Sequence, residues 1–388
     1  MPANIFDPLC IRGVRFPNRI MVSPMCQYSS QDGFANDWHL VHLGSRAVGG
    51  AALVFTEATA VTPEGRISPR DLGIWKDEHI EFLARIVRFI HSQGSVAGIQ
   101  LAHAGRKGST APPWERQGAV PHDQGGWNVV APSPIPFADD YMRPAALTED
   151  GIQRIVRAFA DAARRAHRAG FRVIEVHAAH GYLIQEFLSP ISNHREDQYG
   201  GSFQNRTRLL REVVSAVRAV LPESTPLFVR ISSTDWVEGG WDIEQSVELA
   251  RQLKPLGVDL MDCSSGGNVA HATMPLGPGY QTAFAERIRR EAGILTGAVG
   301  MITSPQQADH IVRTGQADMV AMAREFLRDP YWPLRAGRKL HQPVAWPVQY
   351  LRAAPDGSPA RTPADFVTVE EKLEEQHAVP EEIPDRSR

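Results

Sequence analysis

Apolar positions gather in short runs along the chain, and between these runs they recur with the spacing of amphipathic helices. Eight runs rich in Val, Ile, Leu and Met predict strands at residues 20–22, 51–55, 96–101, 173–176, 227–231, 260–263, 294–299 and 319–322. Segments such as residues 80–90 and 152–166 repeat apolar side chains at intervals of three and four, which predicts helices. Glycines that stop a helix before the next strand are Gly94, Gly170, Gly257 and Gly315.

Alternation of apolar strands with amphipathic helices predicts a fold in which helices cover parallel strands. Strands that are buried on both faces need not alternate in polarity, which fits the continuous apolar runs. Eight such units indicate a closed (β/α)₈ TIM barrel, expected as one domain over residues 1–352. A doubly wound sheet is the alternative, although no G-x-G-x-x-G follows a strand.

Two segments depart from the repeat. Residues 105–144 are dense in Gly, Pro and Trp and predict a long loop excursion after the third strand. Ordered loops of this length on a barrel often act as lids or binding loops. From residue 353 onward Pro, Asp, Glu and Arg dominate, so residues 353–388 are expected to form a C-terminal tail that is disordered or docks on the barrel.

Composition excludes several classes of function. The 388 residues include 41 basic and 44 acidic side chains, and this formal charge of −3 gives no reason to expect nucleic acid or an anionic membrane as partner. The three cysteines lie far apart without C-x-x-C spacing, which predicts neither disulfides nor a zinc or iron–sulfur site. No apolar run approaches the roughly 18 residues of a membrane helix. We therefore expect a soluble, unprocessed protein of the cytoplasm.

Candidate functional residues follow the predicted strands. In a barrel of this type the carboxyl ends of the strands converge on one rim, where active sites lie. The side chains near these ends are Ser23, Pro24, Met25 and Cys26 at the first strand, Ala58 at the second, Gln100 at the third, His177, His180 and Tyr182 at the fourth, and Arg230 at the fifth. A single such residue is more often structural, but their shared position on one rim favours a site.

His177 and His180 have two interpretations. A pair of imidazoles suits zinc, but a zinc site needs a third and a fourth ligand, and Tyr182 and Gln100 are poor candidates. Two neutral imidazoles can instead donate hydrogen bonds to a carbonyl oxygen and stabilise the charge that grows there when an enolate forms. The second role is favoured, and no metal site is predicted.

Five strings in the chain carry a resemblance that covers residues 6–352. They are N-R-I-M-V-S-P-M-C-Q-Y at 18–28, E-A-T-A-V-T-P-E-G-R at 57–66, Q-L-A-H-A-G-R-K at 100–107, E-V-H-A-A-H-G-Y-L-I-Q-E-F-L-S-P at 175–190 and N-H-R-E-D-Q-Y-G-G-S-F-Q-N-R at 193–206. With these strings the chain resembles the Old Yellow Enzyme family of FMN-dependent ene-reductases, specifically its bacterial, thermophilic-like class.

The resemblance implies an FMN site on the rim. The residues that it assigns to the flavin ring are Ser23, Pro24, Met25, Cys26 and Ala58, with Gln100 at the pyrimidine edge and Arg230 near N1 and the C2 carbonyl. Positive charge at that place favours the anionic reduced flavin. The phosphate is expected at the last two strands, near Gly300, Ala323 and Arg324, where barrels commonly bind phosphate. Ala323 stands where this family usually has Gly.

The resemblance also implies roles toward the substrate. His177 and His180 match the pair that binds the substrate carbonyl, and Tyr182 matches the proton donor. Tyr28 matches a substrate-contacting tyrosine, and Cys26 a residue that modulates the flavin potential. Arg352 matches an arginine that reaches into the active site of a neighbouring subunit, which implies a homodimer or homotetramer.

The implied activity is hydride transfer from NADPH or NADH through FMN to the β-carbon of an α,β-unsaturated carbonyl compound, with Tyr182 protonating the α-carbon. Three alternatives remain open from the residues. A dienoyl-CoA or amine dehydrogenase would carry an iron–sulfur domain, for which the cysteines give no support. A metal-dependent hydrolase would use His177 and His180, and an inert barrel would serve only as a binding protein.

Overall fold

A closed barrel forms the centre of the fold, which a computed structural model describes for residues 2–115 and 118–362. Eight parallel strands are hydrogen-bonded in the order β10-β11-β12-β3-β4-β5-β8-β9. They are β3 (Ile20–Val22), β4 (Leu53–Ala60), β5 (Val96–Ala102), β8 (Val173–Ala178), β9 (Leu227–Ser232), β10 (Leu260–Ser264), β11 (Leu295–Ala298) and β12 (Met319–Met322). Each of the eight predicted strands is present, and the predicted (β/α)₈ barrel is confirmed.

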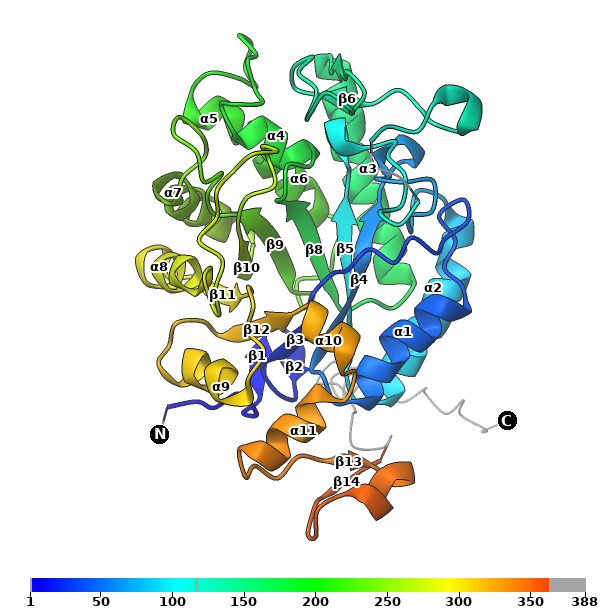
Figure 1. Ribbon diagram of the computed structural model, residues 1–388, viewed down its shortest axis with the longest axis vertical. Coiled ribbons are helices and arrows are strands. Elements are labelled where there is room, and N and C mark those ends of the chain that lie inside the picture. The colour runs from blue at the N-terminus through cyan, green and yellow to red at the C-terminus, as the bar shows by residue number, and fades with distance from the viewer. Residues whose placement is uncertain (1, 116–117, 363–388) are drawn as a thin grey trace, which may run out of the picture.

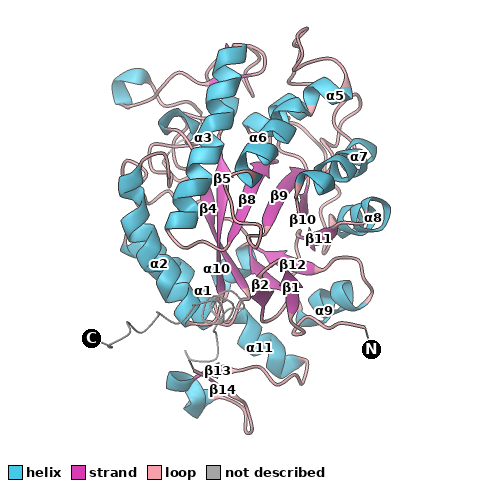
Figure 2. Ribbon diagram, turned by 180° about the vertical axis from the view of Figure 1, so that it is seen from behind, coloured by secondary structure: helices cyan, strands magenta, loops and turns pink. Residues whose placement is uncertain are grey.

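Helices surround the barrel, as Figures 1 and 2 show from opposite sides. They are α1 (Asp37–Val48), α2 (Ile80–Ser92), α3 (Glu149–Arg168), α6 (Arg208–Arg218), α7 (Ile243–Leu253), α8 (Thr282–Ala292), α9 (Pro305–Arg313), α10 (Arg324–Arg328) and α11 (Trp332–Lys339), with the short α4 (Leu183–Leu188) and α5 (Phe203–Arg206). Helix α2 buries Leu83, Val87 and Ile90 against the strands. The apolar spacing in the sequence therefore marks the face that covers the barrel.

The amino-terminal end of the barrel is closed by a hairpin of β1 (Leu9–Ile11) and β2 (Val14–Phe16). Phe16 is fully buried in an apolar cluster that includes Phe55 and Phe228 from two barrel strands. Because apolar side chains fill this end, a ligand can reach polar groups of the barrel only from the opposite end, where the strands finish.

Five strands (β4, β5, β8, β9 and β10) run further than their apolar runs predict, and β4 and β8 do so by more than one residue. Strand β4 extends to Ala60 and β8 to Ala178, so Ala58 and His177 lie inside strands rather than after them. The β4–β5 pairing shifts register between Phe55 and Ala58, which marks a bulge. Polar side chains can continue these strands because they face the barrel interior and meet polar groups of the neighbouring strands.

The predicted excursion after β5 contains a small parallel pair, β6 (Val130–Ala131) and β7 (Ala145–Ala146). Figure 1 shows β6 and α4 at the same end of the barrel. The 3-10 turns Gly105–Lys107 and His122–Gln124 also lie in the excursion. Residues 116 and 117 fall outside the described residues.

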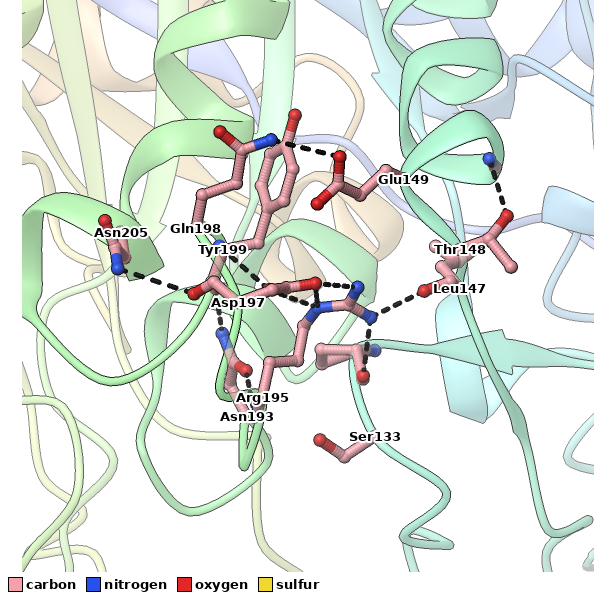
Figure 3. A network of polar contacts seen from close by, with 12 residues as sticks. Ser133, Leu147, Thr148, Glu149, Asn193, Arg195, Asp197, Gln198, Tyr199 and Asn205 are labelled. Atoms are coloured by element: carbon pink, nitrogen blue, oxygen red, sulfur yellow. Dashed lines mark hydrogen bonds and ion pairs between the residues drawn. The ribbon is translucent and has the colours of Figure 1, made fainter.

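Arg195 fastens this excursion to the loop after α4 (Figure 3). Its guanidinium donates to the carbonyl oxygens of Pro132 at 3.0 Å and Leu147 at 2.6 Å, and pairs with the Asp197 carboxylate at 2.5 Å. Asp197 in turn accepts the backbone N–H of Tyr199 at 3.0 Å. One side chain therefore joins the residues that follow β6 and β7 to the loop that follows α4.

Part of the predicted tail packs beside the barrel. Strand β14 (Ala360–Arg361) pairs in parallel with β13 (Trp346–Pro347), and both figures show this pair beyond α11. The Arg361 guanidinium donates to the carbonyl oxygen of Val48 at 2.5 Å, which ties the pair to the end of α1. The remainder of the tail, residues 363–388, lies outside the described residues. Over the part of the chain that the structure describes, none of the helices is long and apolar enough to cross a membrane.

Candidate active site

A layer of charged and amide side chains crosses the barrel interior below the rim. The pairing registers place Gln100 beside Glu175 and Arg230 beside Asp262. Gln100 Nε2 donates to Glu175 Oε1 at 2.8 Å, and Arg230 Nε lies 3.3 Å from Asp262 Oδ2. Burial raises the pKa of Glu175 to about 8. The charge of Asp262 raises this pKa further, while the charge of Arg230 opposes the shift. The neutral form of Glu175 is therefore favoured, so the positive charge of Arg230 is only partly compensated.

The first strand is joined to this layer by Ser23. Arg230 donates from Nη1 to Ser23 Oγ at 2.9 Å, and both side chains are buried. Pro24, Met25 and Cys26 follow Ser23 and are partly buried along the rim. The structure thus brings together the residues predicted after β3 and the arginine predicted in β9, although 207 positions separate Ser23 and Arg230 in sequence.

His177, His180 and Tyr182 form a cluster at the end of β8. The ring centroids of His177 and His180 are 5.2 Å apart, and those of His177 and Tyr182 are 5.1 Å apart. His180 adopts a left-handed conformation with φ of 60°, and its Nε2 lies 2.7 Å from Ser264 Oγ. This turn directs both imidazoles and the phenol to one place, as the short sequence spacing predicts.

The electrostatic surroundings keep this cluster neutral. Burial lowers the pKa of His177 and of His180 well below the usual histidine value, and the charge of Arg230 lowers both further. Burial raises the pKa of Tyr182 well above its usual value. At neutral pH the two imidazoles are uncharged and Tyr182 carries its proton. Both histidines can then donate a hydrogen bond from one ring nitrogen.

Cys26 and Tyr28 follow β3 and lie near enough to Tyr182 for their charges to act on it. The two side chains are hydrogen-bond partners, and Tyr28 has a positive φ of 50°. Burial raises the pKa of the Cys26 thiol, and the charges of Asp71 and Glu57 raise it further. Cys26 is therefore a protonated thiol at neutral pH rather than a nucleophilic thiolate.

A cavity of about 250 Å³ opens where β11 and β12 end. Gly300, Ala323 and Arg324 are among its lining residues, as the sequence predicts for an anion site. Gly300 has φ of 125°, and a Cβ there would come within 2.8 Å of Gln281 Nε2, so only glycine fits. Arg324 is exposed, and its side chain has neither an ion pair nor a hydrogen bond within the part of the chain that the structure describes. Its charge is available to an anion in the cavity.

Arg352 lies apart from the other predicted site residues. It is exposed in the 3-10 segment Val348–Ala353, next to the β13 and β14 pair, which Figure 1 places at the end of the molecule away from α4 and α5. No contact joins it to the rim within the described chain.

A third and a fourth metal ligand are not found beside the two histidines. Among residues 2–115 and 118–362, no group of three or more His, Cys, Asp or Glu side chains is arranged to hold a metal ion. The Nε2 atom of His180 already has Ser264 as its partner. The geometry gives the zinc interpretation no further support.

A parallel barrel with polar groups on its rim and a cavity lined by Arg324 at its last two strands is the arrangement of an α/β-barrel enzyme. The sequence matches the profile of the NADH:flavin oxidoreductase / NADH oxidase family over residues 4–342. The chain belongs to this family. It is therefore an oxidoreductase whose cofactor is FMN, and the resemblance drawn from the five sequence strings is confirmed.

Similar proteins agree with this assignment. An NADPH dehydrogenase of Geobacillus sp. is 49% identical over 354 residues, which cover 91% of this chain and 99% of the relative. An NADPH dehydrogenase of Bacillus subtilis is 47% identical with the same coverage. Among solved structures, morphinone reductase superposes with a TM-score of 0.75 at 28% identity, covering 88% of this chain and 91% of the other.

Several residues of the site were not singled out from the sequence. Glu175 and Lys107 lie within quoted strings, but neither received a role, and Asp262 and Ser264 come from the sixth strand, which received none. Glu175 and Asp262 are charged residues inside otherwise apolar strands, and that is the signal that could have found them.

Proposed function

We propose that the protein is an NADPH-dependent ene-reductase that reduces the double bond of α,β-unsaturated carbonyl compounds. The observation that carries the proposal is the neutral cluster of His177, His180 and Tyr182 beside the rim. NADPH is the proposed electron donor because the relatives with the same length of barrel are NADPH dehydrogenases. Bound FMN would supply the hydride-transfer chemistry that links NADPH to the β-carbon of the substrate.

The residues present fit FMN. His177 Nδ1 is buried and has no hydrogen-bond partner among the described residues, as expected where a polar ligand binds. Gly300, Ala323 and Arg324 would hold the phosphate in the cavity that they line. The ring would be held by Ser23, Pro24, Met25, Cys26, Ala58 and Gln100, with Arg230 supplying positive charge at its pyrimidine edge.

His177 and His180 would bind the carbonyl oxygen of the substrate. Neutral imidazoles donate hydrogen bonds to this oxygen, and these bonds strengthen as negative charge develops on it. Ser264 orients His180 from the neighbouring strand through its 2.7 Å contact. Tyr28 would contact the substrate from the opposite side of the rim, and Cys26 would lie beneath it.

Tyr182 would give its proton to the α-carbon. The O–H bond of the phenol breaks as the C–H bond forms, and the phenolate that remains later regains a proton from water. A phenol whose pKa is raised by burial donates only to a strongly basic site, and the enolate carbon is such a site. His177 holds the Tyr182 ring in edge-on contact, which keeps the hydroxyl near the substrate position.

Arg352 would complete the site of a neighbouring subunit. Within one chain it lies on the exposed segment beyond α11, so it can serve a site only in another copy. Exposed Tyr350 and Leu351 beside it supply apolar surface for such a contact. We therefore propose a homo-oligomer, either a dimer or a tetramer.

Replacement of Tyr182 by Phe tests the proposal. The variant removes one oxygen, so flavin reduction by NADPH should keep its rate, while reoxidation by cyclohex-2-enone should slow by roughly 10²- to 10⁴-fold, as is typical when a general acid is lost. Anaerobic stopped-flow absorbance measures each half-reaction. Tyr199→Phe is the matched control, because the hydroxyl of Tyr199 donates to Glu212 rather than belonging to the cluster of His177, His180 and Tyr182. Unchanged reoxidation in Tyr182→Phe would remove this residue from the proposed role.

A further inference from the structure

Lys107 lies against the cluster of His177, His180 and Tyr182, yet the proposed reaction gives it no task. It ends the 3-10 turn Gly105–Lys107 after β5 and is partly buried. Its Nζ donates to the carbonyl oxygens of His180 at 2.9 Å and Gly267 at 3.1 Å. The same ammonium lies 5.1 Å from the ring centroid of Tyr182 and 4.4 Å from that of Phe137.

These contacts have two physical consequences. The bond to the His180 carbonyl holds a residue whose φ of 60° is unfavourable without support, and this turn carries His180 and, two residues later, Tyr182. The ammonium also supplies a positive charge near the phenol ring in a partly buried setting, where a charge acts more strongly than in water. Removing the Lys107 ammonium would take away the positive charge that lies 5.1 Å from the Tyr182 ring, so a phenolate at Tyr182 would lose this stabilisation.

We propose that Lys107 is the positioning residue for proton transfer by Tyr182. It holds the turn that carries His180 and Tyr182, and its positive charge stabilises the phenolate that remains after Tyr182 has given its proton to the substrate. This inference rests on the proposed function, in which Tyr182 is the proton donor. It adds a task for a residue that does not itself touch the reacting carbon.

The charge of Lys107 depends on pH near neutrality. Burial lowers its pKa to about 8, Arg106 lowers it further, and Glu186 opposes the shift. Lys107 is charged below this value and loses its charge above it, so the stabilisation of the phenolate is present at pH 7 and is lost as pH rises. In wild type we expect the rate of reoxidation by cyclohex-2-enone to fall as pH rises through about 8.

Other titratable groups face the same place and must be separated. Burial raises the pKa of Glu186 to about 8 and that of Asp71 to about 7. Other groups whose charges act on Tyr182 are Cys26, Tyr28, Asp71 and Tyr141, and those that act on Lys107 are Arg106 and Glu186. The charges of Arg230 and of Lys107 itself act on His177 and His180. If the pH profile of reoxidation keeps a step near pH 7 in Lys107→Met, that step belongs to Asp71. If the profile keeps a step near pH 8 in Lys107→Arg, that step belongs to Glu186.

The experiment compares Lys107→Met and Lys107→Arg in the FMN-loaded enzyme. Lys107→Met should slow reoxidation about 10- to 10²-fold at pH 7, since an opposite charge at this distance shifts a pKa by one to two units, and should lose the step near pH 8. Lys107→Arg should restore most of the rate and remove the fall at pH 8, because a guanidinium keeps its charge. Lys254→Met is the control, as Lys254 also donates to a backbone carbonyl, that of Gly293, but precedes β10 at the other end of the barrel.

Two measurements decide how Lys107 acts. In the double variant Lys107→Met/Tyr182→Phe the losses of rate should add less than fully, since the charge of Lys107 acts through Tyr182. Calorimetric titration with 4-hydroxybenzaldehyde should show weaker binding by about tenfold in Lys107→Met and recovery in Lys107→Arg, because the His180 turn is restored.

The outcomes distinguish this inference from the proposed function. Slow reoxidation in Tyr182→Phe with a normal rate and pH profile in Lys107→Met would overturn the inference and leave the function standing. Fully additive losses, or a fall at pH 8 that survives in Lys107→Arg, would also overturn it. Normal reoxidation in Tyr182→Phe would instead contradict the proposed function.

Discussion

Individual side chains of the rim owe their chemical state to burial. His177 is almost fully enclosed and stays neutral because burial lowers its pKa, whereas Tyr182 keeps its proton because burial raises its pKa. Arg230 remains the main positive charge among them, since its carboxyl neighbours Glu175 and Asp262 both have raised pKa values. Desolvation therefore keeps His177 and Tyr182 neutral as hydrogen-bond donors. It also favours the neutral forms of the two carboxyls beside Arg230, so the charge of Arg230 is less compensated.

Arg324 should anchor the phosphate of FMN. Arg324→Ala removes the exposed guanidinium from the cavity at the ends of β11 and β12, and a charged hydrogen bond of this type contributes enough to lower affinity about 10- to 10²-fold. Fluorescence titration of the apoprotein with FMN measures the change. Arg313→Ala, which removes only a surface pair with Asp309, is the control. Equal FMN affinity in both variants would refute the assignment.

Glu175 should make the barrel less stable as pH rises. Its pKa is raised to about 8 in the folded protein, while an unfolded glutamate ionises near 4.5. Between these values the folded state holds more protons than the unfolded state, so the free energy of unfolding falls with rising pH. Thermal unfolding between pH 5 and 8 should show a smaller decrease for Glu175→Gln than for wild type, by a few degrees. The exposed Glu248→Gln should follow wild type, and parallel curves for all three would contradict the prediction.

At the scale of elements, the loops of the rim are held by polar contacts rather than by a core of their own. Arg195 joins the residues after β6 and β7 to the loop after α4, as Figure 3 shows. Its side chain is 10% exposed and its partners are two carbonyl oxygens and a carboxylate. Within the string N-H-R-E-D-Q-Y-G-G, Arg195 therefore has a structural role: it holds two loops of the rim together.

Loss of the Arg195 contacts should lower the free energy of unfolding measurably. Arg195→Ala leaves the carbonyls of Pro132 and Leu147 without their donor, at a cost of about 1–3 kcal/mol, which lowers the unfolding temperature by several degrees. Differential scanning calorimetry measures the shift. Arg164→Ala removes an exposed pair with Asp161 on α3 and should change little. An equally small effect of Arg195→Ala would show that the excursion is held by other contacts.

At the scale of the whole molecule, the apolar core and the polar candidate site lie at opposite ends of the barrel. The amino-terminal end is filled by apolar residues around Phe16, and the opposite end collects the polar rim. The segment that carries Arg352 lies beyond α11, where Tyr350 contacts Tyr331, and Arg361 ties the neighbouring strand β14 to the end of α1 through Val48. Its place outside the barrel is the reason to consider a neighbouring subunit.

Mixed oligomers test the role of Arg352. Subunits with Tyr182→Phe and subunits with Arg352→Ala are each expected to have little activity, but a hybrid places an intact Tyr182 next to the partner's intact arginine. Coexpression should therefore restore part of the activity in cyclohex-2-enone reduction. Replacing the first variant by the double variant Tyr182→Phe/Arg352→Ala should abolish the recovery. Activity that is merely the sum of the two parents would place each site within one chain.

The sequence by itself determined the barrel and most of the rim. Strands buried on both faces must be apolar, so their runs, and the helices between them, could be counted directly. The strings around Cys26, Gln100, His177 and Tyr182 identified the family. Residues close in sequence, such as His177 and Tyr182, come together through one local turn, and their proximity could therefore be predicted.

Only the tertiary structure decided which distant residues meet. The register between neighbouring strands sets Arg230 beside Asp262, and closure of the barrel brings it to Ser23. Lys107 reaches the His180 turn across the gap between two strand ends, which no periodicity of the chain reveals. Protonation states also follow from tertiary structure, because the pKa of a carboxyl or an imidazole depends on desolvation and on charges supplied by other strands.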